Sequence, residues 1–377
     1  MSTSGLTTTQ SGSQETAKLP RPRRVTMQAL TLVAHNEVAL AERPVPEPGP
    51  RDAVVRTTAS MMCASDVHNL SGAMAVPVGR VLGHESVGIV SRVGDAVTRV
   101  REGERVAVTS VTPCGCCDFC QSGAPQQCGG GVGGYKFTTQ QDGSLAEYFV
   151  VPDADFNVAR IPDELTDEQA LYATDSMSTG LAAAEQANIP LGGTVAVFAQ
   201  GAVGLSVTAG ARLLGAGTVI TTATRPLNAR LSAQFGSDLV INPRHEDAIN
   251  KIRDVVGQHG VDCAIEALGT HETFEQAVRA TKAGGTVVNA GYHGWQATGP
   301  LPIPLVSFGF GMGGKTIRAM LCPGGSERLQ RLFRLMVNKR IDPTPMTTHR
   351  FGFGDAAKAF DLLASRADGI IKPLITY

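Results

Sequence analysis

Four cysteines in one short loop have the spacing that points most directly to chemistry. Cys114, Cys117 and Cys120 repeat as C-x2-C-x2-C, and Cys128 follows after seven residues. Four thiolates from one loop can surround Zn²⁺ and leave no position open, which is typical of a structural metal. The closest rival is an iron–sulfur cluster, but its fourth cysteine follows sooner and precedes a proline, whereas a glycine follows Cys128. Four unrelated buried thiols are the other alternative, and Cys116 lies out of register as a bystander.

A second group of metal-binding side chains is spread along the chain. Cys63 in CASDVH, His84 in GHESVG and Asp175 in TDSMSTG supply sulfur, nitrogen and oxygen. Three such ligands would leave one position on Zn²⁺ for water or substrate, as in a catalytic site. Each residue taken singly could be an ordinary buried side chain. The glycine turns around the strand that follows His84, from Gly83 to Gly94, favour the metal site.

Strand–helix alternation begins near Thr194 and predicts a doubly wound parallel sheet. The run TVAVFA leads into a turn that matches G-x-G-x-x-G except that Ala199 replaces the first glycine. Within alternating units this turn predicts a nicotinamide dinucleotide on the following helix. An ordinary strand–helix turn is the alternative. The predicted cofactor-binding residues of the turn are Gly201, Ala202, Val203 and Gly204.

The end of the next β-run indicates which nicotinamide cofactor is used. NAD enzymes usually place an acid about twenty residues beyond the glycine turn, where it binds the ribose 2′-hydroxyl. Here the run GTVITT ends in Ala-Thr224-Arg225-Pro, with no acid. Arg225 can form charge-assisted hydrogen bonds to a 2′-phosphate, and Thr224 adds a hydroxyl. We therefore expect NADP(H), with NAD(H) as a second cofactor; a solvated Arg225 is the alternative.

Taken together, these motifs resemble the zinc-dependent medium-chain alcohol dehydrogenases. The chain is most similar to the bacterial NADP-dependent secondary alcohol dehydrogenases, from about Met27 to Tyr377. The shared stretches are CASDVH, GHESVG, GGYKF, DGSLAEYFVV, TDSMSTG, GAVGL, TRP, GYHG and GMGGKTIRAMLCPGG. The thermophilic secondary enzymes lack the four-cysteine loop, whereas many other members carry it. The resemblance therefore supports the prediction of the fold more strongly than it supports the prediction of the substrate.

The resemblance implies a GroES-like β-rich catalytic domain, a Rossmann domain and two Zn²⁺ per chain. The open-site Zn²⁺ would act as a Lewis acid that lowers the pKa of the bound alcohol. Ser65 and His68 match the family's hydroxyl-to-imidazole proton relay, with a capped turn as the alternative reading. Glu85 would occupy the vacant zinc position between turnovers or lie outside the ligand shell, two readings that stay open.

The same resemblance implies a substrate pocket and an assembly. Tyr135 stands where the secondary enzymes carry tryptophan, so a slightly wider and more polar pocket is expected. The family associates through nucleotide-domain edges, which implies a homodimer or homotetramer. Polyol or primary-alcohol dehydrogenation is the second functional reading, and a non-catalytic zinc-stabilised NADPH-binding protein is a third. The residues implied to line the pocket are Ser110, Val111, Tyr135, Leu321 and Cys322.

Length and composition agree with a soluble two-domain enzyme, for which the resemblance implies a small alcohol or ketone as substrate. With 377 residues, 42% hydrophobic content and a net charge of −1, the chain has ample core material. Nothing in the charge favours nucleic acid or membrane partners, and no apolar run is long enough for a transmembrane helix. The N-terminal segment lacks the apolar core of a signal peptide, so reduced thiols and a cytoplasmic location are expected.

The periodicities divide the chain into a tail and two interleaved domains. A helix after KTIRAM is expected to begin with Ser326 as its cap. Its inward face would carry Leu329, Leu332, Phe333 and Met336. The predicted parts are a disordered tail (1–24), the catalytic domain (25–176), the dinucleotide-binding domain (177–320) and a return segment that completes the catalytic domain (321–377).

Overall fold

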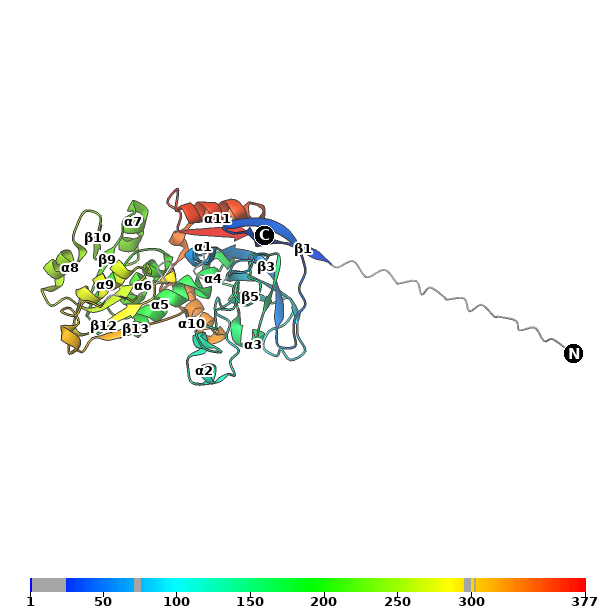
Figure 1. Ribbon diagram of the computed structural model, residues 1–377, viewed down its shortest axis with the longest axis horizontal. Coiled ribbons are helices and arrows are strands. Elements are labelled where there is room, and N and C mark those ends of the chain that lie inside the picture. The colour runs from blue at the N-terminus through cyan, green and yellow to red at the C-terminus, as the bar shows by residue number, and fades with distance from the viewer. Residues whose placement is uncertain (2–24, 71–75, 295–299, 302) are drawn as a thin grey trace.

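In the computed structural model, the chain forms two β-sheet units joined by packed helices (Figure 1). The structure describes Met1 and residues 25–70, 76–294, 300–301 and 303–377. The predicted disordered tail therefore lies, apart from Met1, outside the described residues. The predicted fold class, a GroES-like β-rich part with a Rossmann part, is confirmed by the two sheets described next.

The first unit is built around a seven-stranded sheet and a separate hairpin. Its strands follow the order β14-β15-β3-β4-β5-β7, and β6 pairs with β3. The central strand β3 is buried along most of its length, as its apolar residues require. The hairpin strands are β1 (Thr26–Ala34) and β2 (Glu37–Pro44). The sheet strands are β3 (Ala53–Met61), β4 (Glu85–Val93), β5 (Arg105–Val108), β6 (Tyr148–Val151), β7 (Val158–Arg160), β14 (Thr347–Gly352) and β15 (Lys372–Thr376).

Short helices fill the connections of this unit. The N-terminus of α4 is fixed by a capping box, in which Thr166 and Gln169 satisfy each other's backbone N–H groups. The helices are α1 (Ala64–Leu70), α2 (Asp118–Gln121), α3 (Ala154–Asn157), α4 (Asp167–Thr174), α10 (Ser326–Val337) and α11 (Ala356–Ser365).

The second unit is a six-stranded parallel sheet in the order β10-β9-β8-β11-β12-β13. The order reverses beside β8, the first strand of the unit, which is the Rossmann arrangement. Its strands are β8 (Thr194–Phe198), β9 (Thr218–Thr222), β10 (Leu239–Ile241), β11 (Val261–Glu266), β12 (Thr281–Asn289) and β13 (Thr316–Ala319). Its helices are α5 (Ser176–Gln186), α6 (Ala202–Leu213), α7 (Pro226–Gln234), α8 (Ala248–Val256) and α9 (His271–Ala280).

Helices α4, α5, α6 and α10 join the two units through one continuous apolar core. Burial of Leu329, Leu332, Phe333 and Met336 confirms the predicted inward face of α10. The predicted capping role of Ser326 is wrong. Ser326 is the first helical residue, and Gly325 takes the cap position at φ 109°, a conformation that favours glycine.

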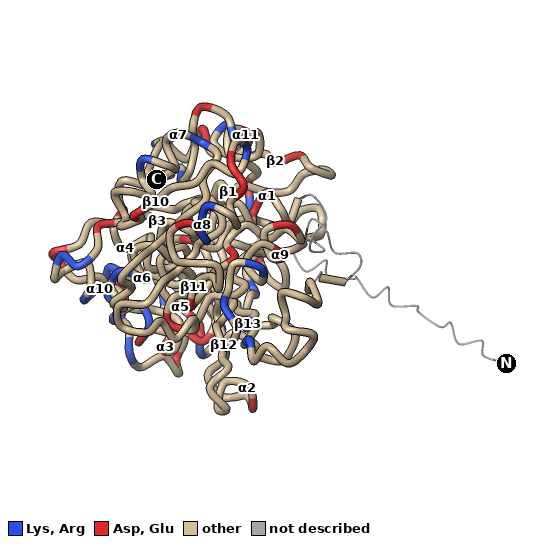
Figure 2. The backbone as a smooth tube through the Cα atoms, turned by 90° about the vertical axis from the view of Figure 1, so that its left-hand side faces the viewer, with Lys and Arg blue, Asp and Glu red and all other residues tan. Residues whose placement is uncertain are grey.

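The described surface mixes both signs of charge. Figure 2 shows Lys and Arg interleaved with Asp and Glu over the face that it presents, in agreement with the net charge of −1. Among the described helices, none is long and apolar enough to cross a membrane.

Candidate functional site

Two neighbouring strands bring the predicted ligands Cys63 and His84 together. Cys63 follows the end of β3, and His84 immediately precedes β4. Since β3 and β4 are antiparallel and Met61 pairs with Glu85, the end of one strand meets the start of the other. Asp175 reaches the same place from the junction of α4 and α5, where it breaks the helical backbone at φ −142° and ψ −75°.

The ligand atoms of Cys63, His84, Glu85 and Asp175 all lie within 4.8 Å of one another. Asp175 Oδ2 is 3.6 Å from Cys63 Sγ and 3.7 Å from His84 Nε2. Glu85 Oε1 is 3.9 Å from the same nitrogen. One sulfur, one imidazole nitrogen and carboxylate oxygens are ligands that Zn²⁺ accepts, so the donor set fits this metal. We call these four residues the buried cluster.

The orientation of the His84 ring is set by Asp66 and Tyr135. His84 Nδ1 lies 3.0 Å from Asp66 Oδ1 and 3.3 Å from the Tyr135 hydroxyl. The other Asp66 oxygen accepts a hydrogen bond from the backbone N–H of Cys63 at 3.0 Å. A neutral His84 ring with its proton on Nδ1 would therefore direct the Nε2 lone pair into the buried cluster.

Electrostatics in the buried cluster favour a cation. Burial, the largest single influence, lowers the pKa of His84, but Asp66, Tyr135 and Asp175 together hold that pKa well above its usual range. Burial likewise raises the pKa of Asp175, but the hydrogen bond and charge of His84, together with the charge of Lys372, outweigh burial and lower that pKa. Desolvation raises the pKa of the Cys63 thiol. An ionised Asp175 beside the buried imidazole of His84 makes this a place where positive charge is stabilised.

Lys372 is the functional candidate that sequence reasoning missed. It is buried, and its Nζ donates to Glu85 Oε1 at 2.5 Å and to the backbone oxygen of Met62 at 3.2 Å. Glu85 Oε2 is buried and has no hydrogen-bond partner among the residues that the structure describes. Burial raises the pKa of Glu85 to about 7, with Lys372 opposing the rise. A lysine in IKP carries no local signal of this role, because only the pairing of β15 with β3 brings it to the cluster.

The predicted relay residues lie on α1 beside the cluster. Ser65 Oγ is 3.2 Å from His84 Nε2. His68 is 7% exposed, and its ring lies 5.9 Å from the Tyr292 ring at an interplanar angle of 19°. Burial lowers the pKa of His68 to about 4, so the imidazole is neutral near neutrality. Tyr292 follows β12 of the Rossmann sheet, so the relay histidine lies where the two units meet.

The predicted pocket residues also come together. Val111, Tyr135 and Cys322 form one buried apolar group, against which Leu321 packs. Ser110 Oγ donates to Asp175 Oδ1 at 3.2 Å and so joins the pocket to the buried cluster. The structure adds Asn69, whose Nδ2 donates to the Tyr135 hydroxyl at 3.2 Å.

The glycine turn of the Rossmann unit takes the expected shape despite its alanine. Ala199 adopts the left-handed φ of 73°, a conformation that costs about 1–2 kcal/mol for a non-glycine residue. A Cβ at Gly204 would lie 2.0 Å from the Ala199 carbonyl oxygen, so only glycine permits this close packing. Gly201 takes the cap position and Ala202 and Val203 begin α6, which leaves their backbone N–H groups at a helix N-terminus.

The two predicted phosphate-binding residues lie at the end of β9. Thr224 is exposed, and Arg225 is half-buried at the cap position of α7. Arg225 Nη1 donates to the backbone oxygen of Ile370 at 2.8 Å. Burial lowers the pKa of Arg225, and the neighbouring Arg366 contributes to the same shift. A guanidinium group at this position can form charge-assisted hydrogen bonds to an anion.

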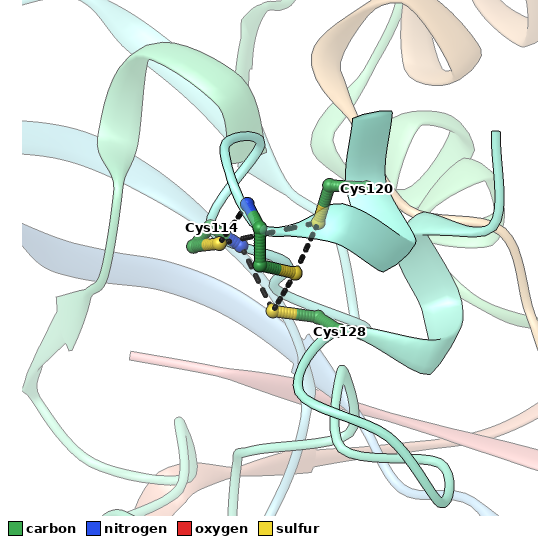
Figure 3. A group of neighbouring side chains, drawn as sticks. Cys114, Cys120 and Cys128 are labelled. Atoms are coloured by element: carbon green, nitrogen blue, oxygen red, sulfur yellow. Dashed lines mark hydrogen bonds between the residues drawn. The ribbon is translucent and has the colours of Figure 1, made fainter. Parts of the chain in front are cut away.

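The cysteine loop brings its four predicted ligands together, and Figure 3 labels three of them, Cys114, Cys120 and Cys128. The sulfurs of Cys117 and Cys120 are 3.5 Å apart, those of Cys117 and Cys128 3.8 Å, and those of Cys114 and Cys120 4.0 Å. Backbone N–H groups of the loop also point at sulfur, as from Cys117 to Cys114 at 3.3 Å. Four thiols at these separations fit a tetrahedral Zn²⁺ site.

Comparisons with protein families match both parts of the chain. Residues 49–163 match the alcohol dehydrogenase GroES-like domain, and residues 202–338 match the zinc-binding dehydrogenase domain.

Individual relatives match nearly the whole chain. An alcohol dehydrogenase of Cupriavidus necator is 42% identical over 92% of this chain and 97% of its own length. An NADP-dependent isopropanol dehydrogenase of Thermoanaerobacter brockii is 39% identical over 93% of this chain and 99% of its own. Among solved structures, the alcohol dehydrogenase TADH from Thermus sp. ATN1 superposes with a TM-score of 0.83. It is 28% identical and covers 93% of this chain and 99% of its own.

Proposed function

Because this chain belongs to the zinc-binding alcohol dehydrogenase family, we propose that it interconverts secondary alcohols and ketones with NADP(H). The observation that carries the proposal is the buried cluster, whose four ligand atoms lie within 4.8 Å of one another beside the relay residues. The similarity to the Thermoanaerobacter brockii relative, which is an NADP-dependent isopropanol dehydrogenase, supports the substrate class and the cofactor.

The buried cluster would hold the catalytic metal through Cys63, His84 and Asp175. Bound there, Zn²⁺ supplies Lewis acidity that lowers the pKa of the substrate hydroxyl. Ser110 and Asp66 fix the second oxygen of Asp175 and the imidazole of His84, which keeps both ligands in one orientation.

The chain's own relay would carry away the hydroxyl proton. Ser65 can accept it and pass it on, since a serine hydroxyl cannot hold a proton as the final base. His68 is the acceptor in this proposal, because burial keeps its imidazole neutral at physiological pH. Tyr135, Val111 and Leu321 would exclude water from the reacting carbon.

Glu85 is proposed as the exchangeable ligand of the same metal. One of its oxygens is held by Lys372, and the other is buried without a partner, so a carboxylate oxygen is available to a cation. The Lys372 ammonium would balance the extra negative charge when Glu85 binds.

Gly201 and the N-terminus of α6 would hold the dinucleotide cofactor, which would supply or accept the hydride. Its 2′-phosphate would bind Arg225 and Thr224. Arg225→Ala should lower kcat/KM for NADP(H) about 10- to 150-fold, the value of about 1.5–3 kcal/mol for a hydrogen bond to a charged group. The control is kcat/KM for NAD(H), which should change little. An unchanged cofactor ratio, or a preference for NAD(H) in the natural chain, would refute the contact.

The four-cysteine loop is proposed to bind a second, structural Zn²⁺, which gives two per chain. The supporting observation is the set of sulfur–sulfur separations between 3.5 and 4.0 Å. Elemental analysis of reconstituted protein should return about two zinc ions per chain. An iron content with visible charge-transfer absorption would instead favour the cluster alternative.

The edge of the Rossmann sheet is proposed as a contact between copies of the chain. Among the described residues, β13 is the last strand of the sheet, so one row of its backbone groups has no strand partner there. Large apolar side chains are exposed in the segment that precedes β13, namely Leu305, Val306, Phe310 and Met312. Sedimentation should give a dimer or tetramer, and a monomer at working concentration would refute this. The cytoplasmic location stays a prediction.

Steady-state kinetics test the function as a whole. Propan-2-ol and acetone should be turned over with NADP(H), and chelation followed by dialysis should abolish the rate until zinc is restored. If kcat/KM were higher for polyols or primary alcohols than for propan-2-ol, the proposed substrate class would be wrong and one of these would take its place. Full cofactor binding without any turnover would favour the non-catalytic binding protein.

A further inference from the structure

The fifth thiol of the cysteine loop has a position of its own. Cys116 is exposed and is not part of the group of four sulfurs that lie within 4.8 Å of one another. Its Sγ lies 3.5 Å from Cys114 Sγ. Its backbone N–H also points at Cys114 Sγ, at 3.5 Å. Cys116 therefore stands outside the proposed metal shell but in contact with one of its ligands.

The backbone between the two thiols is shaped to keep them together. Gly115 takes a left-handed φ of 74°, which turns the chain within Cys-Gly-Cys. A Cβ on Gly115 would lie 2.7 Å from a ring carbon of Phe156, so the turn is also fixed by packing. A disulfide needs its Cβ atoms close and its sulfurs in contact, and this turn already brings the sulfurs into contact.

An exposed arginine, Arg51, donates hydrogen bonds to the same turn. Arg51 donates from Nη2 to the backbone oxygen of Cys114 at 3.1 Å and from Nη1 to Cys116 Sγ at 3.8 Å. Both thiols line a surface cavity of about 280 Å³ together with Arg51, Asp153 and Phe156. A small polar oxidant can therefore reach Cys116 directly.

We propose that Cys114 and Cys116 form a peroxide-sensitive thiol pair that releases the metal of the cysteine loop. Hydrogen peroxide, as a two-electron oxidant, converts the Cys116 thiol to a sulfenic acid: the O–O bond breaks, an S–O bond forms and water leaves. Cys114 sulfur then attacks Cys116 sulfur, so that an S–S bond forms, the S–O bond breaks and hydroxide leaves. The disulfide removes one of the four sulfur ligands. This inference rests on the proposed structural zinc.

Loss of the loop metal would also affect the substrate pocket, because backbone hydrogen bonds connect the loop to the pocket. Gly134 N–H donates to the Gln126 carbonyl of the loop at 3.2 Å, and Thr112 N–H donates to Gly134 at 2.8 Å. The next residue is Tyr135, whose hydroxyl lies 3.3 Å from His84 Nδ1. A loosened loop would therefore weaken one wall of the pocket, and reduction with fresh zinc would restore it.

The test compares the parent with Cys116→Ser and Cys263→Ser, all loaded with zinc. Cys263 is a matched control, because its thiol is buried in the Rossmann unit and donates to the Ala187 carbonyl at 3.1 Å, a bond that serine can keep. Zinc release into a chromogenic chelator is followed after addition of hydrogen peroxide, and peptides are mapped without reduction.

The parent and Cys263→Ser should show a fast release of about one zinc per chain and a peptide linked through Cys114 and Cys116. In Cys116→Ser the fast phase should slow roughly tenfold or more, since an intramolecular thiol acts at high effective molarity. Dithiothreitol with zinc should reverse the change in the parent. Equal release rates in the parent and Cys116→Ser, or fast release without the linked peptide, would overturn the proposal.

The zinc content of the proteins, measured before any oxidant is added, tests separately whether the cysteine loop binds zinc. If the loop binds no zinc, Cys117→Ser will contain as much zinc as the parent. If Cys117→Ser has lost one zinc and the parent still shows no fast release, the thiol pair alone is refuted.

Discussion

The buried cluster and the cysteine loop are the two proposed metal sites of the chain, and they lie in opposite settings. The cluster draws its ligands from three distant segments, Cys63, His84–Glu85 and Asp175, and adds the buried counter-ion Lys372. The loop draws all its ligands from residues 114–128, of which Cys114, Cys117 and Cys120 are partly exposed and Cys128 is buried. An open, charged site needs the whole fold to hold it, whereas a closed thiolate site needs only a local turn.

Removal of the buried counter-ion should have the largest effect. Lys372→Met leaves Glu85 buried without its partner and should cost about 3–5 kcal/mol in the free energy of unfolding. The double variant Lys372→Met/Glu85→Gln should be much less destabilised, because no unpaired charge remains. Urea unfolding of the zinc-loaded proteins measures both.

The loop offers the matched control for that prediction. Arg51 pairs with Asp153 at 2.9 Å, but its side chain is 56% exposed. Arg51→Ala should therefore change the unfolding free energy by only about 0–1 kcal/mol. If Lys372→Met costs no more than Arg51→Ala, the buried pair does not contribute to stability as described.

Loss of one ligand from each site should separate activity from stability. Asp175→Ala should lower kcat/KM roughly 10²- to 10³-fold, the effect typical of removing one electrostatic stabiliser, with little change in Tm. Cys117→Ser should lower Tm and zinc content, and should leave most of the activity at low temperature. Steady-state kinetics, calorimetry and zinc analysis check the pair. If both variants lose only stability, the buried cluster is not a catalytic site.

The turn in the cysteine loop should be sensitive at one glycine and tolerant at another. Gly115→Ala must accept φ 74° and a contact of 2.7 Å with Phe156, so it should cost about 1–3 kcal/mol. Gly123 has φ 89° but no atom within 4 Å of an added Cβ. Gly123→Ala should therefore cost about 1 kcal/mol. Equal Tm shifts for the two variants would show that packing against Phe156 does not hold the loop.

The same contrast explains how much the sequence could predict. Loop ligands are close in sequence, so their spacing alone indicates a metal and the structure brings the four sulfurs together. The strand–helix alternation likewise predicted a doubly wound parallel sheet, because each strand–helix unit is local, whereas the order of the strands comes from the structure. For Cys63, His84 and Asp175, the residues alone left open whether they meet, and the family resemblance was needed to join them.

What could not be predicted depends on contacts between distant segments. Lys372 reaches Glu85 only because β15 pairs with β3, and Tyr292 reaches His68 only because the two units pack together. The cap of α10 was assigned wrongly because both serine and glycine occur at the cap position of helices. The sequence offers the two side by side, and only the backbone conformation shows that Gly325, at φ 109°, is the cap. The roles of the site residues stay predictions until the variants above are measured.

The smallest expected effect is a change in the free energy of unfolding at low pH. It should arise from His68 of the relay, because the cysteine loop has no histidine. Burial lowers the pKa of His68 to about 4, against an ordinary value of 6.5, with Arg366 adding to the shift and Asp66 opposing it. The unfolded chain therefore binds a proton on His68 between about pH 6.5 and about pH 4, while the folded chain does not. The contribution of the neutral ring is full above about pH 6.5 and is lost as the pH falls towards about 4.

The stability difference between the parent and His68→Gln should thus shrink by on the order of 1 kcal/mol across this range, after allowance for solvent screening. Urea unfolding of both proteins at matched pH values measures it, and any loss of zinc in acid affects both alike. A constant difference would mean that His68 is not held in its neutral form by the fold, and its role as the relay base would have to be abandoned.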